Sequence, residues 1–271
     1  MTTPDHVAIL RQAGAPPDVA RSDPDNICVV HGVPVVLGRS EDPVLQTEHS
    51  FLAFAPDSVL SDPAWVGAAL DRCADEHGWA ATALIRAPAE TLVRAPWPAL
   101  RFLRYVRKRV DRIQAEPPTP ADGVRVEPVS AATRADVLLM LLASCRMTAE
   151  AAAVDIDVAA LRSYLADQFA DLGAEGGARS YVAVDEDRGV LGHVTWHAEQ
   201  DVELVDIDAV DHRLLRGLTE PLLRACVTGV PGDRHVIGNV VGGDDQADAV
   251  FRRLVERGWA PTETYWLVRV P

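Results

Sequence analysis

Two aspartates inside an apolar segment could supply a general base. Asp206 and Asp208 lie two positions apart in residues 202–210 (VELVDIDAV), and residues so spaced in a β-strand share one face. Two like charges beside an apolar floor can raise the pKa of one carboxyl group towards neutrality, which suits a base. The alternative is that these carboxylates face solvent or hold a cationic substrate, and the sequence leaves both interpretations open.

A short segment after these aspartates could bind a phosphate. Arg216, Gly217, Leu218 and Thr219 open an expected helix directly after the expected strand. A helix start offers unpaired backbone N–H groups and the positive end of the helix dipole, and a threonine hydroxyl can also donate to phosphate oxygen. A plain helix-start glycine without a ligand is the competing explanation, because arginine followed by glycine is a weak motif.

Two histidines form a further candidate group. His193 and His197 lie four positions apart on an expected strand, so they share a face and could act as a base or as metal ligands. A hydrogen-bonded strand histidine is the other interpretation. Because no third ligand follows in a readable motif, we expect no metal site.

The composition excludes several classes of protein. The chain has 271 residues and a formal net charge of -14, which argues against nucleic-acid binding and is compatible with a cationic partner such as an amine. Four cysteines without a paired CxxC motif predict neither a disulfide framework nor a zinc site. With no signal peptide and no apolar run of membrane-spanning length, the sequence predicts a cytoplasmic protein that does not enter a membrane.

A proline-rich segment divides the chain. Residues 115–123 (AEPPTPADG) hold three prolines and a glycine, which cannot continue a helix or a central strand. We therefore expect an N-terminal α+β domain at 1–115, a linker at 116–123 and a second domain at 124–271. In the first domain, strands are expected at 33–38, 50–56 and 81–87, and a helix from Pro63 to His77, capped by Asp62 and ended by Gly78.

Residues 98–114 are expected to form a basic helix. Their apolar residues recur at spacings of three and four, and the other faces carry six basic residues from Arg101 to Arg112. The segment could dock an acidic acyl carrier protein or contact the phosphates of coenzyme A. A solvated face that balances the acidic body is the other interpretation.

The C-terminal half resembles the GNAT acyltransferase superfamily. Its expected order is strand, two helices, three strands, helix, strand, helix and strand, at 124–129, 131–147, 155–172, 180–186, 190–198, 202–210, 217–226, 235–241, 244–257 and 265–270. The resemblance implies an α/β (α+β) fold, with a mixed central sheet flanked by helices. The order of strands and helix at 50–87 suggests that the N-terminal half is a degenerate copy, as in tandem members.

The resemblance also implies where acyl-CoA binds. In the family, the fourth strand splays from the fifth, pantetheine pairs with the fourth strand, and pyrophosphate rests on the next helix start. These positions correspond to Ala209, Val210, Arg216, Gly217, Leu218 and Thr219. A backbone N–H of residues 207–210, here assigned to Ala209, would stabilise the oxyanion, and Asp208 or Asp206 would be the base.

The sequence departs from the family pattern at three positions. Leu214 stands where a polar or cationic residue is expected, and Glu220 adds a negative charge near the phosphate position. Leu254 replaces the tyrosine that protonates the leaving thiolate in many members. We therefore expect an N-acyltransferase that uses acetyl-CoA or another acyl-CoA on a primary amine of a small molecule or peptide. A non-catalytic acyl-CoA-binding module, or an acyltransferase that uses a carrier-protein thioester, is the alternative.

Overall fold

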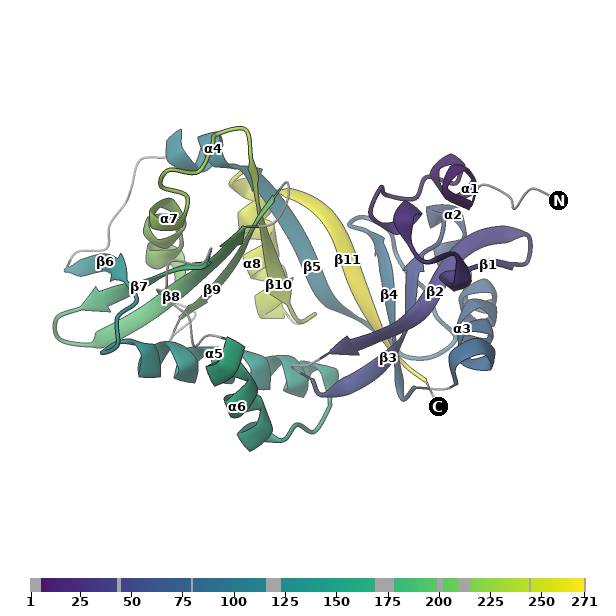
Figure 1. Ribbon diagram of the computed structural model, residues 1–271, viewed down its shortest axis with the longest axis horizontal. Coiled ribbons are helices and arrows are strands. Elements are labelled where there is room, and N and C mark those ends of the chain that lie inside the picture. The colour runs from purple at the N-terminus through teal and green to yellow at the C-terminus, as the bar shows by residue number, and fades with distance from the viewer. Residues whose placement is uncertain are drawn as a thin grey trace. The chain divides into compact units, whose positions relative to one another are not determined.

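The computed structural model describes residues 6–42, 45–78, 80–115, 123–168, 178–198, 202–209, 215–243 and 245–270. The chain forms two compact units. The N-terminal unit comprises Met1–Tyr105, Val241–Phe251 and Pro261–Pro271, and the C-terminal unit comprises Val106–Val240 and Arg252–Ala260 (Figure 1).

The sheet of the N-terminal unit begins with three antiparallel strands. They are followed by two helices and by a fourth strand, β4, which lies parallel to β3. The elements are α1 (His6–Gln12), the 3-10 turns Val19–Arg21 and Pro24–Asn26, β1 (Ile27–Val30), β2 (Val33–Asp42), β3 (Thr47–Phe54), α2 (Asp57–Leu60), α3 (Pro63–His77) and β4 (Thr82–Pro88). The three strands and the helix expected from the sequence are all present.

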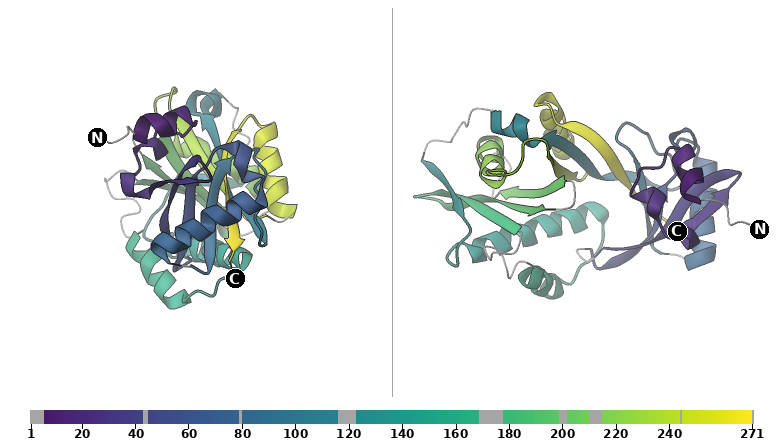
Figure 2. Two further views of the ribbon diagram at one scale, coloured as in Figure 1. Left: turned by 90° about the vertical axis from the view of Figure 1, so that its right-hand side faces the viewer. Right: turned by 45° about the horizontal axis from the view of Figure 1, so that its top comes forward.

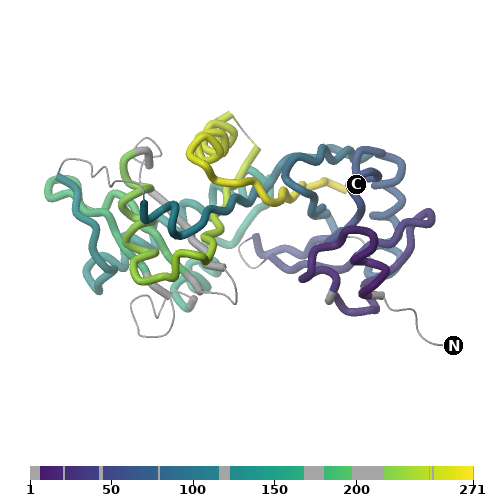
Figure 3. The backbone as a smooth tube through the Cα atoms, turned by 90° about the horizontal axis from the view of Figure 1, so that it is seen from above, coloured from purple at the N-terminus to yellow at the C-terminus, as the bar shows by residue number. Residues whose placement is uncertain are grey.

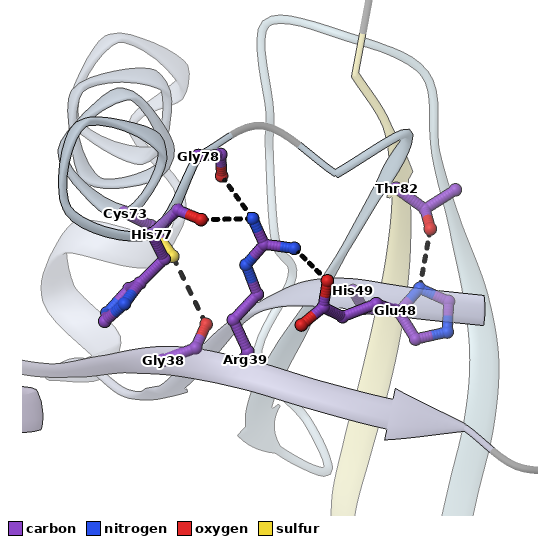
Figure 4. Close-up of polar contacts among 8 residues, drawn as sticks. All are labelled: Gly38, Arg39, Glu48, His49, Cys73, His77, Gly78 and Thr82. Atoms are coloured by element: carbon purple, nitrogen blue, oxygen red, sulfur yellow. Dashed lines mark hydrogen bonds and ion pairs between the residues drawn. The ribbon is translucent and has the colours of Figure 1, made fainter.

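Helix α3 covers one face of this sheet, and both of its ends are fixed by side chains. Asp62 accepts hydrogen bonds from the backbone N–H groups of Ala64, at 2.9 Å, and Trp65, at 3.4 Å. At the other end, the Arg39 guanidinium donates to the carbonyls of His77 and Gly78, where a positive charge is favourable (Figure 4). The core beneath α3 gathers large buried side chains, among them Leu52, Trp65, Leu70, Ile85 and Trp266.

The last strand of the chain belongs to the N-terminal unit. Strand β11 (Ala260–Arg269) pairs antiparallel with β4 over seven residue pairs, from Glu263–Pro88 to Arg269–Thr82. Figure 3 shows this C-terminal segment, in yellow, running among the N-terminal residues. The compact units therefore differ from the sequence-based division at 116–123, because β11, near the C-terminus, pairs with β4 in the N-terminal half. Most of that expected linker lies outside the described residues.

The C-terminal unit has the expected order of elements. They are β6 (Val124–Pro128), α5 (Arg134–Ala152), α6 (Val158–Gln168), β7 (Ala178–Asp185), β8 (Gly189–Ala198), β9 (Val202–Ala209), α7 (Leu215–Cys226) and β10 (His235–Val241), followed by α8 (Asp245–Glu256), which continues from one unit into the other. Neighbouring strands run β10-β9-β8-β7-β6, with α7 over one face and α5 over the other (Figure 2). The predicted fold class, an α/β protein with a mixed sheet flanked by helices, is confirmed.

The expected basic helix at 98–114 is wrong, because this segment is mainly a strand. It forms β5 (Ala99–Arg109) and then the short helix α4 (Val110–Ala115). Alternate residues of β5, including Arg104 and Lys108, are buried. The Arg104 guanidinium lies 2.6 Å from Asp248, and Lys108 Nζ donates to the carbonyl of Arg257 at 2.8 Å. These partners are distant in sequence, so no local pattern revealed them. The spacing of the apolar residues alone indicated a helix.

Candidate active site

The parallel pair β9 and β10 is joined at one end only. Its register consists of three residue pairs, from His235–Val202 to Ile237–Leu204. Beyond them β9 continues to Ala209 and β10 to Val241, and the described residues of these strands share no further parallel pairs. An extended ligand can pair with the backbone groups of a strand edge that lacks a neighbouring strand. The resemblance predicts such an opening between these two strands.

The candidate bases lie on the stretch of β9 beyond its three parallel pairs with β10. In the antiparallel register with β8, Asp208 stands opposite His193, Asp206 opposite Thr195, and Ala209 opposite Gly192. The side chains of β9 are outside the described residues, as is the whole of Val210, so the structure places these candidates by backbone position. It brings Asp206, Asp208 and Ala209 together beside the end of the β9–β10 register.

Strand β8 presents buried polar residues opposite the two aspartates. His193 and Thr195 are both fully buried, and Thr195 Oγ1 lies 3.1 Å from Ser180 Oγ on β7. A buried imidazole is held by the surrounding packing and has a restricted orientation. His193, one of the two candidate histidines, therefore lies across from the candidate base Asp208, while the side chain of His197 is outside the described residues.

Helix α7 begins shortly after β9, as the sequence predicts. It starts at Leu215, and its first turn contains no acidic residue. Gly217 and Thr219 are partly buried, whereas Leu218 is 2% exposed and belongs to the core. Leu218 can therefore offer a ligand its backbone only. The Arg216 side chain and residues 210–214, including Leu214, lie outside the described residues.

An ion pair neutralises the acidic residue that was expected to oppose a phosphate. Glu220, on α7, is bonded to the guanidinium of Arg257, which follows the last turn of α8. The negative charge of Glu220 is therefore compensated within the C-terminal unit. Sequence reasoning missed Arg257, because nothing in the local pattern connects it with α7.

The N-terminal unit repeats this strand–helix–strand arrangement. Strands β3 and β4 are parallel, are joined by three residue pairs from Ser50–Ala83 to Leu52–Ile85, and enclose α3 in the sequence. If these pairs are matched to those of β9 and β10, Phe54 and Pro56 take the places of Asp206 and Asp208. Two features of the candidate site are thus absent from the repeat: the carboxylates, and a helix start free of acidic caps.

The repeat also holds a buried polar contact between its two parallel strands. His49, which is fully buried, has its Nδ1 atom 2.6 Å from Thr82 Oγ1 (Figure 4). Burial lowers the pKa of His49, so the neutral imidazole is favoured. This contact ties β3 to β4 beside their short register and accounts for one buried imidazole nitrogen.

Among the described residues, no helix is both long enough and apolar enough to cross a membrane. Within the same residues, no group of three or more His, Cys, Asp or Glu side chains is placed to hold a metal ion.

Comparison with known proteins identifies similar solved structures. No protein-family model and no curated protein matches the chain. A GCN5-related N-acetyltransferase from Kribbella flavida is 15% identical, with a TM-score of 0.47, over 100% of this chain and 98% of that one. A tandem GNAT protein from the clavulanic acid biosynthesis pathway is 14% identical, with a TM-score of 0.48, over 100% and 97%. A functionally unknown conserved protein from Staphylococcus epidermidis is 12% identical, with a TM-score of 0.49, over 86% and 93%.

These solved structures are similar to the chain at the level of the fold. The order of elements from β6 to β11 is the order that the resemblance predicted from the sequence implied. At these identities the activities of the similar GNAT proteins do not transfer to this chain.

Proposed function

We propose that this protein is an acyl-CoA-dependent N-acyltransferase. The observation that carries the proposal is the combination of the one-ended β9–β10 register with a helix, α7, that begins beyond β9 without an acidic residue in its first turn. The open edge of β9 suits the amide groups of a pantetheine arm, and the start of α7 suits the pyrophosphate. Acetyl-CoA is the proposed donor, and a primary amine of a small molecule or peptide is the proposed acceptor.

The proposed reaction assigns a role to each candidate residue. Asp208, or Asp206, accepts a proton from the amine as its nitrogen attacks the thioester carbon. The backbone N–H of Ala209 donates to the developing oxyanion while the carbon–sulfur bond breaks. Coenzyme A is held by the backbones of Ala209 and Val210.

The remaining ligand contacts come from the start of α7. Arg216, Gly217, Leu218 and Thr219 offer backbone N–H groups, a guanidinium and a hydroxyl to the phosphates. Leu254 cannot protonate the leaving thiolate, so water or another group supplies that proton.

We also propose that the N-terminal unit is a degenerate copy without an acyl-CoA site. Asp62 already accepts hydrogen bonds from the first N–H groups of α3, and its negative charge repels a phosphate. Phe54 and Pro56 provide no base at the positions that match the two aspartates. The acyl-CoA site is therefore assigned to the C-terminal unit alone.

A non-catalytic acyl-CoA-binding module is the second candidate. The absence of a proton donor at Leu254, on α8, favours it, since binding needs no general acid. Docking of an acidic carrier protein on a basic helix loses its structural basis. Arg104 and Lys108 are buried on strand β5 and bonded within the protein.

Calorimetric titration with acetyl-CoA tests the proposed function. We expect the wild-type protein to bind and Gly217→Glu to abolish binding, because a carboxylate in the first turn of α7 occupies and repels the phosphate position. Thr228→Glu is the matched control: it adds the same charge on an exposed residue just beyond the opposite end of α7. This variant should bind acetyl-CoA as the wild type does.

The outcomes separate the two candidate functions. Binding that is lost in Gly217→Glu only, together with release of CoA thiol when primary amines are added, supports the acyltransferase. Binding without thiol release across a panel of amines supports the binding module. Absence of binding by the wild type contradicts both.

A further inference from the structure

We infer that Arg257 is a phosphate-binding residue of the acyl-CoA site and that Glu220 holds its guanidinium in place when no ligand is bound. The inference rests on the proposed function and adds a residue to it. It begins from an ion pair between α7 and the end of α8, both in the C-terminal unit. The sequence indicated no role for Arg257, and it indicated Glu220 only as a negative charge near the phosphate position.

Hydrogen bonds hold both the N–H and the carbonyl of Arg257. Its N–H donates to the carbonyls of Arg253 and Leu254, both at 3.1 Å, and its own carbonyl accepts from Lys108 Nζ at 2.8 Å. The next residues, Gly258 with a φ of 79° and the buried Trp259, end the helix and anchor the turn. Only the side chain, which is 48% exposed, can change position.

The ion pair places this side chain next to the proposed phosphate position. Glu220 follows Gly217 by three residues, and residues so spaced on a helix are neighbours on its surface. Side chains on a helix also lean towards its N-terminus, so Glu220 directs its partner towards the first turn of α7. We therefore expect the guanidinium about one helical turn from the backbone N–H groups that would receive the pyrophosphate.

The guanidinium of Arg257 explains how a site with Leu214, instead of a cationic residue, at that position can still bind a phosphate. The family pattern expects a polar or cationic residue at that position, and here Arg257 brings a positive charge from a different element. A guanidinium binds phosphate oxygens with two parallel hydrogen bonds, and it is attracted more strongly to a doubly charged pyrophosphate than to one carboxylate. Because exposed ion pairs contribute little to stability, exchanging Glu220 for the ligand costs little.

A purely structural clamp between α7 and α8 is the competing explanation, and the two make opposite predictions for Glu220. If Glu220 competes with the ligand for Arg257, removing its charge should strengthen binding. If the pair only clamps the helices, Glu220→Gln and Arg257→Gln should change stability together and leave affinity unchanged or lower it in both. The sign of the Glu220 effect therefore separates the explanations.

Calorimetry with acetyl-CoA on four proteins provides the test: wild type, Arg257→Gln, Glu220→Gln and the control Arg252→Gln. We expect Arg257→Gln to weaken binding roughly tenfold, the usual loss for one charge-assisted interaction, and to reduce its salt dependence. Glu220→Gln should tighten binding several-fold. Arg252→Gln removes the same charge from an exposed position on α8 and should leave affinity unchanged. Circular dichroism melts confirm that each variant is folded.

The results distinguish failure of this inference from failure of the proposed function. If the wild type does not bind acetyl-CoA, both fail. If the wild type binds and Arg257→Gln binds equally well, or Glu220→Gln binds more weakly, only the role of Arg257 is overturned. Repeating the titrations with 3′-dephospho-CoA identifies the contact. A loss of the same size assigns Arg257 to the pyrophosphate, and a loss seen only with the intact cofactor assigns it to the 3′-phosphate.

Discussion

Asp208 and His193 occupy opposite positions of β9 and β8, so the candidate base lies across from a histidine that solvent does not reach. The sequence indicated both residues separately, through their spacing on two strands. Only the register shows that they are neighbours, because a shift by one residue would place His193 opposite Ile207 or Ala209 instead. Asp206 lies opposite Thr195 instead, and the role of either aspartate as the base stays a prediction.

Replacing the carboxyl group of Asp208 by an amide tests its role as a base. We predict that Asp208→Asn lowers kcat for acetyl transfer to a primary amine by on the order of 10²-fold, the low end of what a general base contributes. The affinity for acetyl-CoA should change little, because Asn has nearly the same shape and binding uses the backbone of β9. Kinetics of thiol release and calorimetry measure the two effects.

Asp206→Asn is the control for that experiment. It makes the same change two residues earlier on β9 and should reduce kcat much less. An unchanged rate in Asp208→Asn would remove this residue from the mechanism, and a larger loss in Asp206→Asn would transfer the role to Asp206.

At the scale of elements, local signals predicted most of the fold. Helix α3 begins and ends where Asp62, Pro63 and Gly78 predict, because caps and a positive φ act on neighbouring residues only. Strand β10 likewise has the expected bounds. The expected helix at 98–114 fails for the opposite reason, since Arg104 and Lys108 are bonded to residues that no local pattern reveals. The Glu220–Arg257 ion pair was missed for the same reason, because its two residues are also distant in sequence.

Substitutions of two arginines in β5 test whether this segment is a strand. On a helix, Arg104 and Arg107 would share a face, but on β5 they alternate, so Arg104 is buried and Arg107 exposed. Arg104 bonds to Asp248 and to the carbonyl of Gly242, and its guanidinium lies 4.6 Å from the centre of the Phe251 ring. We predict that Arg104→Gln lowers the free energy of unfolding by about 2 kcal/mol, as for hydrogen bonds to charged groups.

Arg107→Gln is the matched control on the same strand. It should change the free energy of unfolding by no more than about 0.5 kcal/mol, as is usual for surface positions. Urea unfolding followed by circular dichroism measures both variants. Equal effects of the two substitutions would contradict the alternation of β5.

At the scale of the whole molecule, the chain contains one strand–helix–strand arrangement twice. In both units a set of antiparallel strands leads to a parallel pair that is joined by three residue pairs. The sequence suggested this relation from the order of elements at 50–87, but it gave no sign that β11 pairs with β4. That pairing joins segments that are far apart in the sequence, so it is visible only in the folded protein.

The number of acyl-CoA sites per chain tests the proposal that only the C-terminal unit binds acyl-CoA. We predict a stoichiometry of one acetyl-CoA per chain, because the first N–H groups of α3 already bond to Asp62, whereas α7 has no acidic residue in its first turn. Asp62→Ala removes the cap and should lower the free energy of unfolding by about 1 kcal/mol, while stoichiometry and affinity stay unchanged. A second site in the wild type would show that the N-terminal unit still binds the cofactor. A second site in Asp62→Ala alone would show that this one carboxylate is what closes an otherwise intact phosphate position.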